Sequence, residues 1–196
     1  RKPLDETEVP EELRGRDRAL FGPGLSVDQT VDRIIRAVRD EGDAALRRFN
    51  KGLDHADTPV IEVTREEVER AYDRVPSDLV DALKLSASRI RLYHERQKNH
   101  VWRNFEEDGM GMIVRPLQRV GVYMPGTAIV YPSSVLMTAI PAQVAGVPEI
   151  YLTSPAAEDG GVAPVKLVAA DIAGVKSIYR AGGAHAVAAL AYGTES

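Results

Sequence analysis

The sequence has no cysteine, which excludes both a disulfide framework and a zinc site built on thiolates. A long apolar run is also missing. The longest mostly apolar stretch, residues 135–147, is too short to span a bilayer and contains Pro141 and Gln143. Residues 1–10 are acidic and lack the apolar core of a secretion signal. We therefore expect a soluble cytoplasmic protein that has no membrane partner.

A strong excess of either charge is absent as well. The 25 lysines and arginines nearly balance 29 aspartates and glutamates, which gives a net charge of −4. Nucleic acid is not expected as the main partner, because binding phosphates requires a concentrated basic surface.

Charge is unevenly distributed along the chain. Residues 1–110 carry 20 basic and 24 acidic side chains, whereas residues 111–196 carry 5 and 5. So few charges cannot surround the second part with solvated side chains, and we expect much of its surface to face a partner domain, a partner subunit or further chain. The boundary is predicted between Pro116 and Val120. The predicted parts are an arm at residues 1–25, a partial first α/β domain at 26–118 and a second domain at 119–196.

The first part has the periodicity of helices with one intervening strand. Apolar residues at three- and four-residue steps predict one helix that begins near Asp28, capped by Asp28 or Ser26; they are Val31, Ile34, Ile35, Val38, Ala45, Leu46 and Phe49. Residues 59–63 are then predicted to form a short strand, and Thr64 and Glu67 have the spacing of a capping box.

A further helix is expected from Ser77 to about His100, followed by a hairpin. The residues predicted to face inward from this helix are Leu79, Leu83, Ala87 and Ile90. Residues 102–105 and 110–114 are predicted to pair around a turn at 106–109.

The second part alternates strands and helices. Strands are predicted at residues 120–123, 149–153 and 177–180, and helices at 133–145, 163–173 and 184–192. The pattern Ala-Gly-Val-x-x-Ile-Tyr occurs at residues 145–151 and again at 173–179, as expected if one βα unit is used twice. The sequence therefore predicts the α/β class: an incomplete Rossmann-like parallel sheet domain, preceded by a mixed α/β segment of a second domain.

Open parallel sheets bind ligands at the carboxyl ends of their strands, so the turns there are the first place to look for a site. Tyr123 ends the first predicted strand and is followed by Pro125 and Gly126. Its ring and hydroxyl could contact a flat ligand, or it could pack a loop around a Pro-Gly turn. Spacing alone favours packing.

The turn at Gly182 and Gly183 opens a predicted helix, whose amino terminus attracts anions. A tight strand-to-helix turn needs glycine whatever it binds, and the Rossmann fingerprint G-x-G-x-x-G is absent. His185 follows this turn, either as a surface residue at a helix start or as a ligand contact. The other histidines, His55, His94 and His100, are scattered and do not indicate a metal site.

Several motifs resemble the amino-terminal portion of histidinol dehydrogenases. Val-Gly-Val-Tyr-Met-Pro-Gly stands at residues 120–126, Tyr-Pro-Ser-Ser-Val-Leu-Met at 131–137, and Gly-Gly-Ala-His-Ala-Val-Ala-Ala-Leu-Ala-Tyr-Gly-Thr-Glu-Ser at 182–196. With residues 38–46 and 140–147, they cover nearly the whole chain in the family's order.

The resemblance implies an NAD-linked, zinc-dependent homodimer that oxidises L-histidinol to L-histidine in two hydride transfers. By similarity, Tyr123 falls at an NAD-contacting tyrosine and His185 at an NAD-contacting glutamine of the family. Pro125, Gly126 and Gly183 would complete the cofactor contacts. The family has Pro-Gly-Gly where this chain has Pro-Gly-Thr at residues 125–127.

The family's zinc ligands and its Glu-His acid-base pair lie beyond Ser196. The resemblance therefore assigns neither a catalytic residue nor a metal ligand to this chain, and the isolated 196-residue chain is expected to be inactive. Two alternatives remain open at this point: a non-catalytic nucleotide-binding or assembly module, and a related dehydrogenase that acts on another small alcohol.

Overall fold

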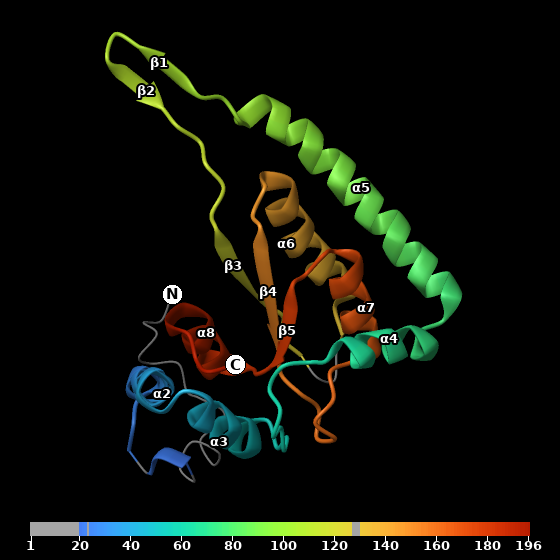
Figure 1. Ribbon diagram of the computed structural model, residues 1–196. Helices are drawn as coiled ribbons and strands as arrows, with labels where there is room; N and C mark the ends of the chain where they lie inside the picture. Colours follow the sequence, from blue (N-terminus) through green and yellow to red (C-terminus); the bar gives the residue numbers. More distant parts are fainter. Residues whose placement is uncertain (1–19, 23, 127–129) are drawn as a thin grey trace, which may run out of the picture.

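The computed structural model describes residues 20–22, 24–126 and 130–196 (Figure 1). Most of the predicted arm at residues 1–25 therefore lies outside the described residues. In chain order the elements are α2 (Val27–Glu41), α3 (Asp43–Leu53), α4 (Arg65–Arg74), α5 (Ser77–Val101), β1 (Phe105–Glu107), β2 (Met110–Met112), β3 (Arg119–Tyr123), α6 (Pro132–Ala145), β4 (Glu149–Ser154), α7 (Pro164–Ile172), β5 (Ser177–Arg180) and α8 (Gly183–Tyr192).

A parallel sheet in the order β3-β4-β5 forms the centre of the molecule. Its register pairs Tyr123 with Thr153 and Ser154 with Arg180, so the carboxyl ends of the three strands meet at one edge. Helices α6 and α7 cover one face, and α8 lies on the other face beside α2 and α3 (Figure 1). Helices α5 and α4 form an outer layer over α6 and α7. The predicted α/β class with a parallel sheet is confirmed.

The repeated βα unit is present in the structure. Gly146 ends α6 with a φ of 89°, and Gly174 follows α7 with a φ of 73°. Side chains rarely adopt such positive φ values, so both chain reversals depend on glycine. Each turn leads into the next parallel strand, as the echo at residues 145–151 and 173–179 predicted.

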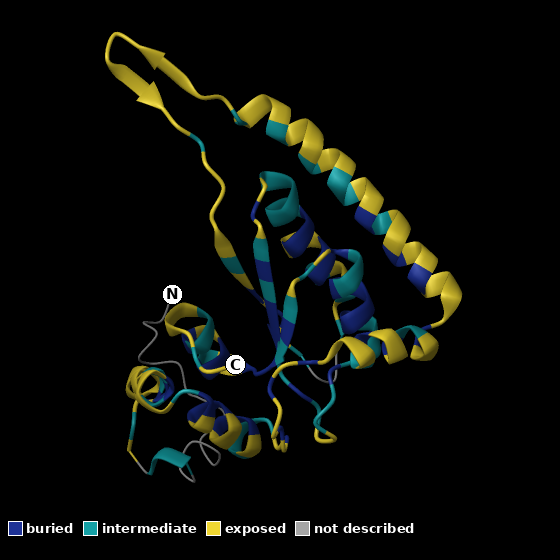
Figure 2. Ribbon diagram, in the orientation of Figure 1, coloured by how far each residue is buried: buried dark blue, intermediate teal, exposed yellow. Residues whose placement is uncertain are grey.

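Two apolar cores hold these layers together, and both combine residues from the first and second parts of the sequence. The larger core joins α4 and α5 to α6, α7 and the sheet, with Leu83 and Ala87 against residues such as Leu136 and Ile140. The smaller core joins α2 and α3 to Ala188 of α8. Figure 2 shows the buried residues between the layers. A domain boundary at residue 118 stays a prediction, because neither part has a core of its own among the described residues.

The single helix expected from Asp28 through Phe49 is wrong, because Gly42 separates α2 from α3. Gly42 has a φ of 57° and a ψ of −131°, a conformation that interrupts the helix. Of the two expected caps, Ser26 is the one that caps α2, and Asp28 lies in the first turn. The Ser26 hydroxyl accepts the Gln29 N–H, and the Gln29 side chain accepts the Ser26 N–H. The apolar positions nevertheless face one core, since the two helices share it.

The strand expected at residues 59–63 is reduced to one antiparallel bridge, between Glu62 and Tyr179. The Arg180 guanidinium donates to the backbone carbonyls of Val60 and Glu62, at 3.2 and 2.7 Å, and is paired with Glu67. Two backbone carbonyls of this segment therefore accept hydrogen bonds from a side chain and not from a neighbouring strand. The segment runs beside β5 but does not form a regular series of strand-to-strand hydrogen bonds with it.

Helix α5 matches the expected range, but Val80 rather than Leu79 faces the core. Leu79 is 39% exposed and Val80 is 7% exposed. The Thr64–Glu67 capping box of α4 is confirmed, since the Thr64 hydroxyl accepts the Glu67 N–H and the Glu67 carboxylate accepts the Thr64 N–H.

The predicted hairpin is confirmed as β1 and β2. Its turn is shorter than expected: Asp108 and Gly109 have φ values of 52° and 77°, as in a two-residue type I′ turn. The hairpin projects from the end of α5, and all of its residues are exposed (Figures 1 and 2).

Candidate cofactor site at the carboxyl edge of the sheet

The direction of winding reverses at the carboxyl edge of the sheet. The connections from β3 to β4 and from β4 to β5 run over one face through α6 and α7, whereas the chain leaves β5 on the other face and α8 packs back against β3. Leu190 of α8 lies against Gly121 of β3, where an added Cβ would come within 2.7 Å of a Leu190 methyl group. In open α/β sheets, the crevice at such a reversal is where ligands bind.

Tyr123 and Gly183, both expected at the site, are brought together by the fold. The Tyr123 hydroxyl accepts a hydrogen bond from the Gly183 N–H, at 3.1 Å. The side chain therefore links the end of β3 to the start of α8 across the edge. Tyr123 remains 37% exposed, so part of its ring can still contact a ligand.

The glycines of the β5–α8 turn are required by close packing. A Cβ at Gly182 would lie 2.7 Å from the Cβ of Pro155 and 3.0 Å from Oδ2 of Asp54. Gly183 has a φ of 54°, which disfavours other residues. Both properties follow from the tight turn and do not by themselves require a ligand.

Pro125 and Gly126 form the turn after β3, and Lys166 holds this turn from below. The Lys166 ammonium donates to the carbonyls of Pro125 and Gly126 and to the hydroxyl of Ser154; the bonds to Pro125 and Ser154 measure 3.1 and 2.9 Å. Lys166 is only 1% exposed, and burial lowers the pKa of its ammonium. Thr127, where the chain departs from the family's second glycine, lies outside the described residues.

Sequence reasoning missed Lys166, although a signal was present. It is the one lysine or arginine between Arg119 and Lys176, and it stands within an otherwise apolar run of α7. A lone cation in an apolar helix indicates a buried polar contact, because an uncompensated buried charge is costly.

His185 lies behind the β5–α8 turn and is fully buried, so the interpretation of it as a surface residue is wrong. Its ring packs 5.6 Å from the ring of Phe49, and its Nε2 lies 3.0 Å from Oδ1 of Asn50. Asn50 is itself fully buried, and its amide nitrogen donates to Thr58 Oγ1 and to the Arg180 carbonyl, at 2.7 and 2.6 Å.

This network fixes the protonation of His185. A backbone carbonyl can only accept, so the Asn50 amide nitrogen must face Arg180, and its oxygen must face His185. The Nε2 of His185 is therefore the protonated nitrogen, and its Nδ1, which has no partner among the described residues, is an acceptor. Burial lowers the pKa of His185 to about 4, and the imidazole is neutral at neutral pH.

The residues after α8 fasten this side of the edge to α3. The Glu195 carboxylate accepts the Asp43 N–H at 2.8 Å, at the amino terminus of α3, and the Ser196 hydroxyl donates to Asp43 Oδ1 at 2.9 Å. Ser196 therefore serves a packing contact here.

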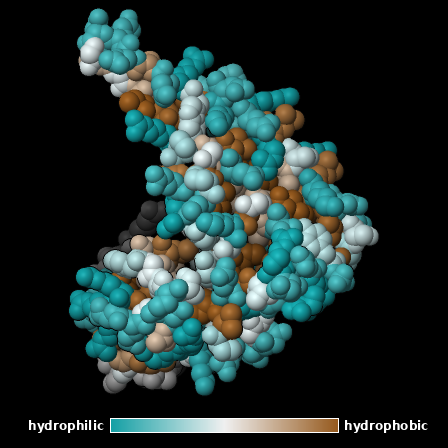
Figure 3. Space-filling model, viewed as in Figure 1, coloured by the Kyte–Doolittle hydropathy of each residue, from teal (hydrophilic) through white to brown (hydrophobic). Residues whose placement is uncertain are grey.

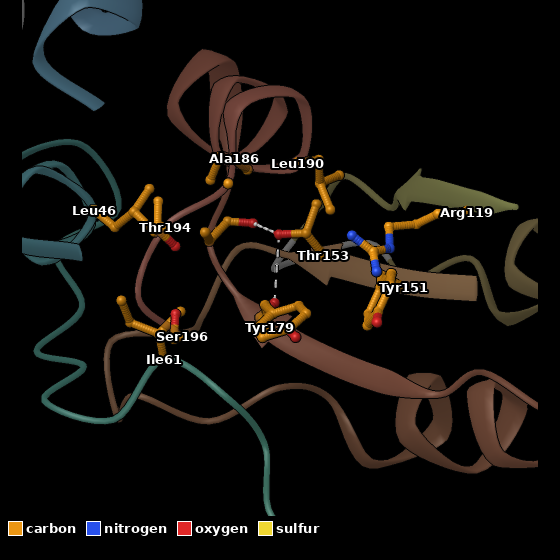
Figure 4. Close-up of a pocket in the computed structure, with 13 residues that line it drawn as sticks. Leu46, Ile61, Arg119, Tyr151, Thr153, Tyr179, Ala186, Leu190, Thr194 and Ser196 are labelled. Atoms are coloured by element: carbon orange, nitrogen blue, oxygen red, sulfur yellow. Dashed lines mark hydrogen bonds between the residues drawn. The ribbon is translucent and has the colours of Figure 1, made fainter. Parts of the chain in front are cut away.

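Two cavities lie near the edge. The larger, of about 240 Å³, lies beneath α8 on the face of the sheet; its lining includes Thr153, which donates to the Ala181 carbonyl at 2.7 Å (Figure 4). The smaller, of about 90 Å³, lies at the edge itself and is lined by Gly126, Lys166 and Arg74 among others. Neither the Tyr123–Gly183 bridge nor His185 lines the larger cavity.

Among the described residues, no three histidine, aspartate or glutamate side chains gather in a way that could hold a metal ion. Nor does any described helix have both the length and the apolarity that crossing a bilayer demands.

Comparison with known proteins shows the family to which the chain is similar. Residues 24–196 match the family model described as histidinol dehydrogenase. The chain is 49% identical over 196 residues to the histidinol dehydrogenase of Moorella thermoacetica, covering 98% of this chain and 45% of the relative. It is 49% identical over 182 residues to that of Natronomonas pharaonis, covering 91% and 42%.

A solved structure has the same fold. The crystal structure of histidinol dehydrogenase from Elizabethkingia anophelis superposes with a TM-score of 0.80 at 31% identity, over 96% of this chain and 44% of that one. The chain thus spans less than half the length of the relatives it matches.

Proposed function

Because the chain belongs to the histidinol dehydrogenase family, we propose that it forms the cofactor-binding portion of an enzyme that oxidises L-histidinol to L-histidine with NAD. The observation that carries this proposal is the carboxyl edge, where the Tyr123–Gly183 bridge and the Pro125–Gly126 turn stand at the reversal of winding.

The proposed cofactor contacts are Tyr123, Pro125, Gly126 and Gly183. Tyr123 offers an aromatic surface and a hydroxyl, and the glycines allow the backbone to approach the ligand closely. His185 is buried as the structure stands, so we assign it the support of the turn from behind. Its unprotonated Nδ1 would accept a hydrogen bond from a ligand that displaced the turn.

NAD, when bound, accepts hydride from the substrate. The residues of this chain would bind and orient it: the turns fix its position at the edge, and α8 closes one side. Zinc enters the proposal only through the family resemblance, since the described residues supply no ligand set for it. We assign no step of the reaction to zinc.

We also propose that the protein is cytoplasmic, and this proposal rests on the biosynthetic role alone.

Calorimetric titration with NAD tests the proposed binding site. We expect saturable binding to the unmodified chain and at least about tenfold weaker binding to Tyr123→Ala, since an aromatic contact and a bridge are lost together. Tyr93→Ala is the matched control, because Tyr93 is 65% exposed on α5, far from the edge. Absence of NAD binding by the unmodified chain contradicts the proposal.

A second experiment tests the reaction. Histidinol, NAD and zinc should yield no NADH with the isolated 196-residue chain. The same mixture should yield NADH when the zinc ligands and acid-base pair of the family are supplied by a longer protein that contains this chain. Turnover by the isolated chain would show that the catalytic groups lie elsewhere than the resemblance implies.

We also propose that the protein is a homodimer in which a second copy covers the hairpin. The register places Phe105, Met110 and Met112 on one face of β1 and β2, together with Glu107 near the turn. The three apolar side chains are 57%, 73% and 44% exposed. Figure 3 shows hydrophobic surface near the base of the hairpin. The acidic tip, residues 106–108, is complementary in charge to the exposed arginines of α5.

Light scattering tests this interface. The unmodified chain should be a dimer, and Met110→Glu should shift it toward monomer, because a charge would be buried in an apolar contact. A stable monomer of the unmodified chain contradicts the interface.

A further inference from the structure

Lys166 has no role in the binding site as proposed so far, yet it is the most completely buried cation among the described residues. Its three hydrogen-bond partners are all neutral: two backbone carbonyls and one hydroxyl. No carboxylate is bonded to it within the described part of the chain. An ammonium has three N–H donors, and each of them meets one of these acceptors. In the charged form, Lys166 donates all three of these bonds.

The hydrogen bonds from Lys166 to the Pro125 and Gly126 carbonyls, here called the tether, determine the direction in which the backbone groups of the turn after β3 point. The described residues contain no cis peptide bond, so the carbonyl of Pro125 and the N–H of Gly126, which share one peptide plane, point in opposite directions. Because Lys166 draws the Pro125 carbonyl inward, the Gly126 N–H points away from the buried ammonium. Gly126 has a φ of 88°, so the turn has this shape only with glycine at that position.

We propose that Lys166 is a positioning residue, which turns the Pro125 and Gly126 carbonyls inward so that the Gly126 N–H faces the edge as a donor to a phosphate oxygen of the cofactor. This inference rests on the proposed function, because it requires NAD to bind at this edge. The ligand chemistry is an anionic phosphate oxygen, for which an outward backbone N–H is a suitable donor.

Deprotonation of Lys166 should weaken its hydrogen bonds to the two carbonyls, because a neutral amine is a weaker donor than an ammonium. Burial lowers the pKa of this ammonium, so the charged form is lost earlier on raising the pH than for an exposed lysine. The charged groups that line the same small cavity are Arg74 and Asp159, and Asp159 accepts the Gly161 N–H at 2.9 Å. Affinity for NAD should therefore fall as the pH rises.

The test compares Lys166→Met, which keeps the length of the side chain but removes the charge, with the unmodified chain. NAD affinity is measured by calorimetry. The Gly126 amide is followed by NMR on protein with labelled proline and glycine, because signals from Pro-Gly pairs can then be selected. The sequence has only two such pairs, at residues 23–24 and 125–126. We expect affinity to fall at least about tenfold and the NAD-induced shift of the Gly126 amide to be lost. Lys176→Met, at an exposed lysine paired with Glu149 at the opposite end of the sheet, should change neither.

The outcomes separate the two proposals. If the unmodified chain does not bind NAD, the proposed function fails. If it binds NAD, and Lys166→Met binds equally well with the same Gly126 shift, the positioning role is overturned.

A pH series on folded protein covers the case in which Lys166→Met does not fold. Affinity of the unmodified chain should decline as the pH is raised above neutral, whereas Lys166→Arg, whose guanidinium stays charged, should show a flatter profile. Identical profiles for these two proteins would also overturn the role.

Discussion

The two turns at the carboxyl edge are supported in opposite ways. The β3–α6 turn rests on Lys166, a buried charged group whose three partners are neutral oxygens. The β5–α8 turn rests on His185 and Asn50, a neutral network in which burial keeps the imidazole unprotonated. The comparison teaches that two turns at one sheet edge can be held in different ways, one by a buried cation and the other by hydrogen bonds between neutral side chains. The stability of the two turns should therefore respond differently to pH.

The largest loss of stability is expected when the hydrogen-bond network beneath the β5–α8 turn is removed by substitution of Asn50. Asn50→Ala removes the hydrogen bonds to Thr58, Arg180 and His185 and leaves buried groups without partners. We expect the free energy of unfolding to fall by about 4 kcal/mol, measured by chemical denaturation. Asn99→Ala, at an exposed position of α5, is the control and should change stability little. A loss at Asn50 no larger than at Asn99 would mean that the network is dispensable.

The second prediction concerns pH. The folded-state pKa of His185 is about 4, below its ordinary value of 6.5, so the unfolded chain takes up the proton first as the pH falls. Stability is therefore present above pH 6.5 and is lost between pH 6.5 and about 4, by at most about 3 kcal/mol. His185→Gln should lack this component. Parallel stability profiles of the two proteins across that window would contradict a buried neutral imidazole.

A smaller effect is expected where the end of the chain joins α3. Glu195→Ala removes the carboxylate that accepts the Asp43 N–H at the helix amino terminus. The expected loss is about 1 kcal/mol of unfolding free energy, as for other helix caps. Glu158→Ala, an exposed acid in the β4–α7 connection, tests whether any lost negative charge has the same effect.

The smallest stability effect is expected at the bridge between the two turns. Tyr123→Phe keeps the ring and removes only the hydroxyl that accepts the Gly183 N–H. Because this bond is partly exposed, its loss should cost about 0.5–1 kcal/mol in thermal or chemical unfolding. A much larger loss would mean that the two turns depend on each other more than one hydrogen bond implies.

Local patterns were sufficient to predict most of the fold. The alternation of strands and helices after residue 119, the capping box at Thr64, and a hairpin between residues 102 and 114 are confirmed. Of the two caps expected for the first helix, Ser26 is the one the structure has. Each of these depends on neighbouring residues, which periodicity and turn chemistry describe directly. Gly42 was missed as a break because the apolar positions on both sides of it face the same core.

The supports of the site could not be predicted in the same way, because they join residues far apart in the sequence. Asn50 and His185 are 135 residues apart, and Lys166 reaches across 41 residues to Pro125. No local pattern marks Asn50 as the partner of a histidine. The turns themselves were predictable, since parallel strands must end at one edge, but the side chains beneath them depend on tertiary packing.

NMR of the chain with labelled glycine tests NAD binding at the carboxyl edge most directly. The 16 glycines include Gly126 and Gly183 at the edge, Gly193 at the cavity beneath α8, and Gly109 on the hairpin. On titration with NAD, the amides of Gly126 and Gly183 should shift together and saturate at one affinity, while Gly109 stays unchanged. Shifts confined to Gly193, or no saturable shift at the edge, would contradict a cofactor site formed by these two turns.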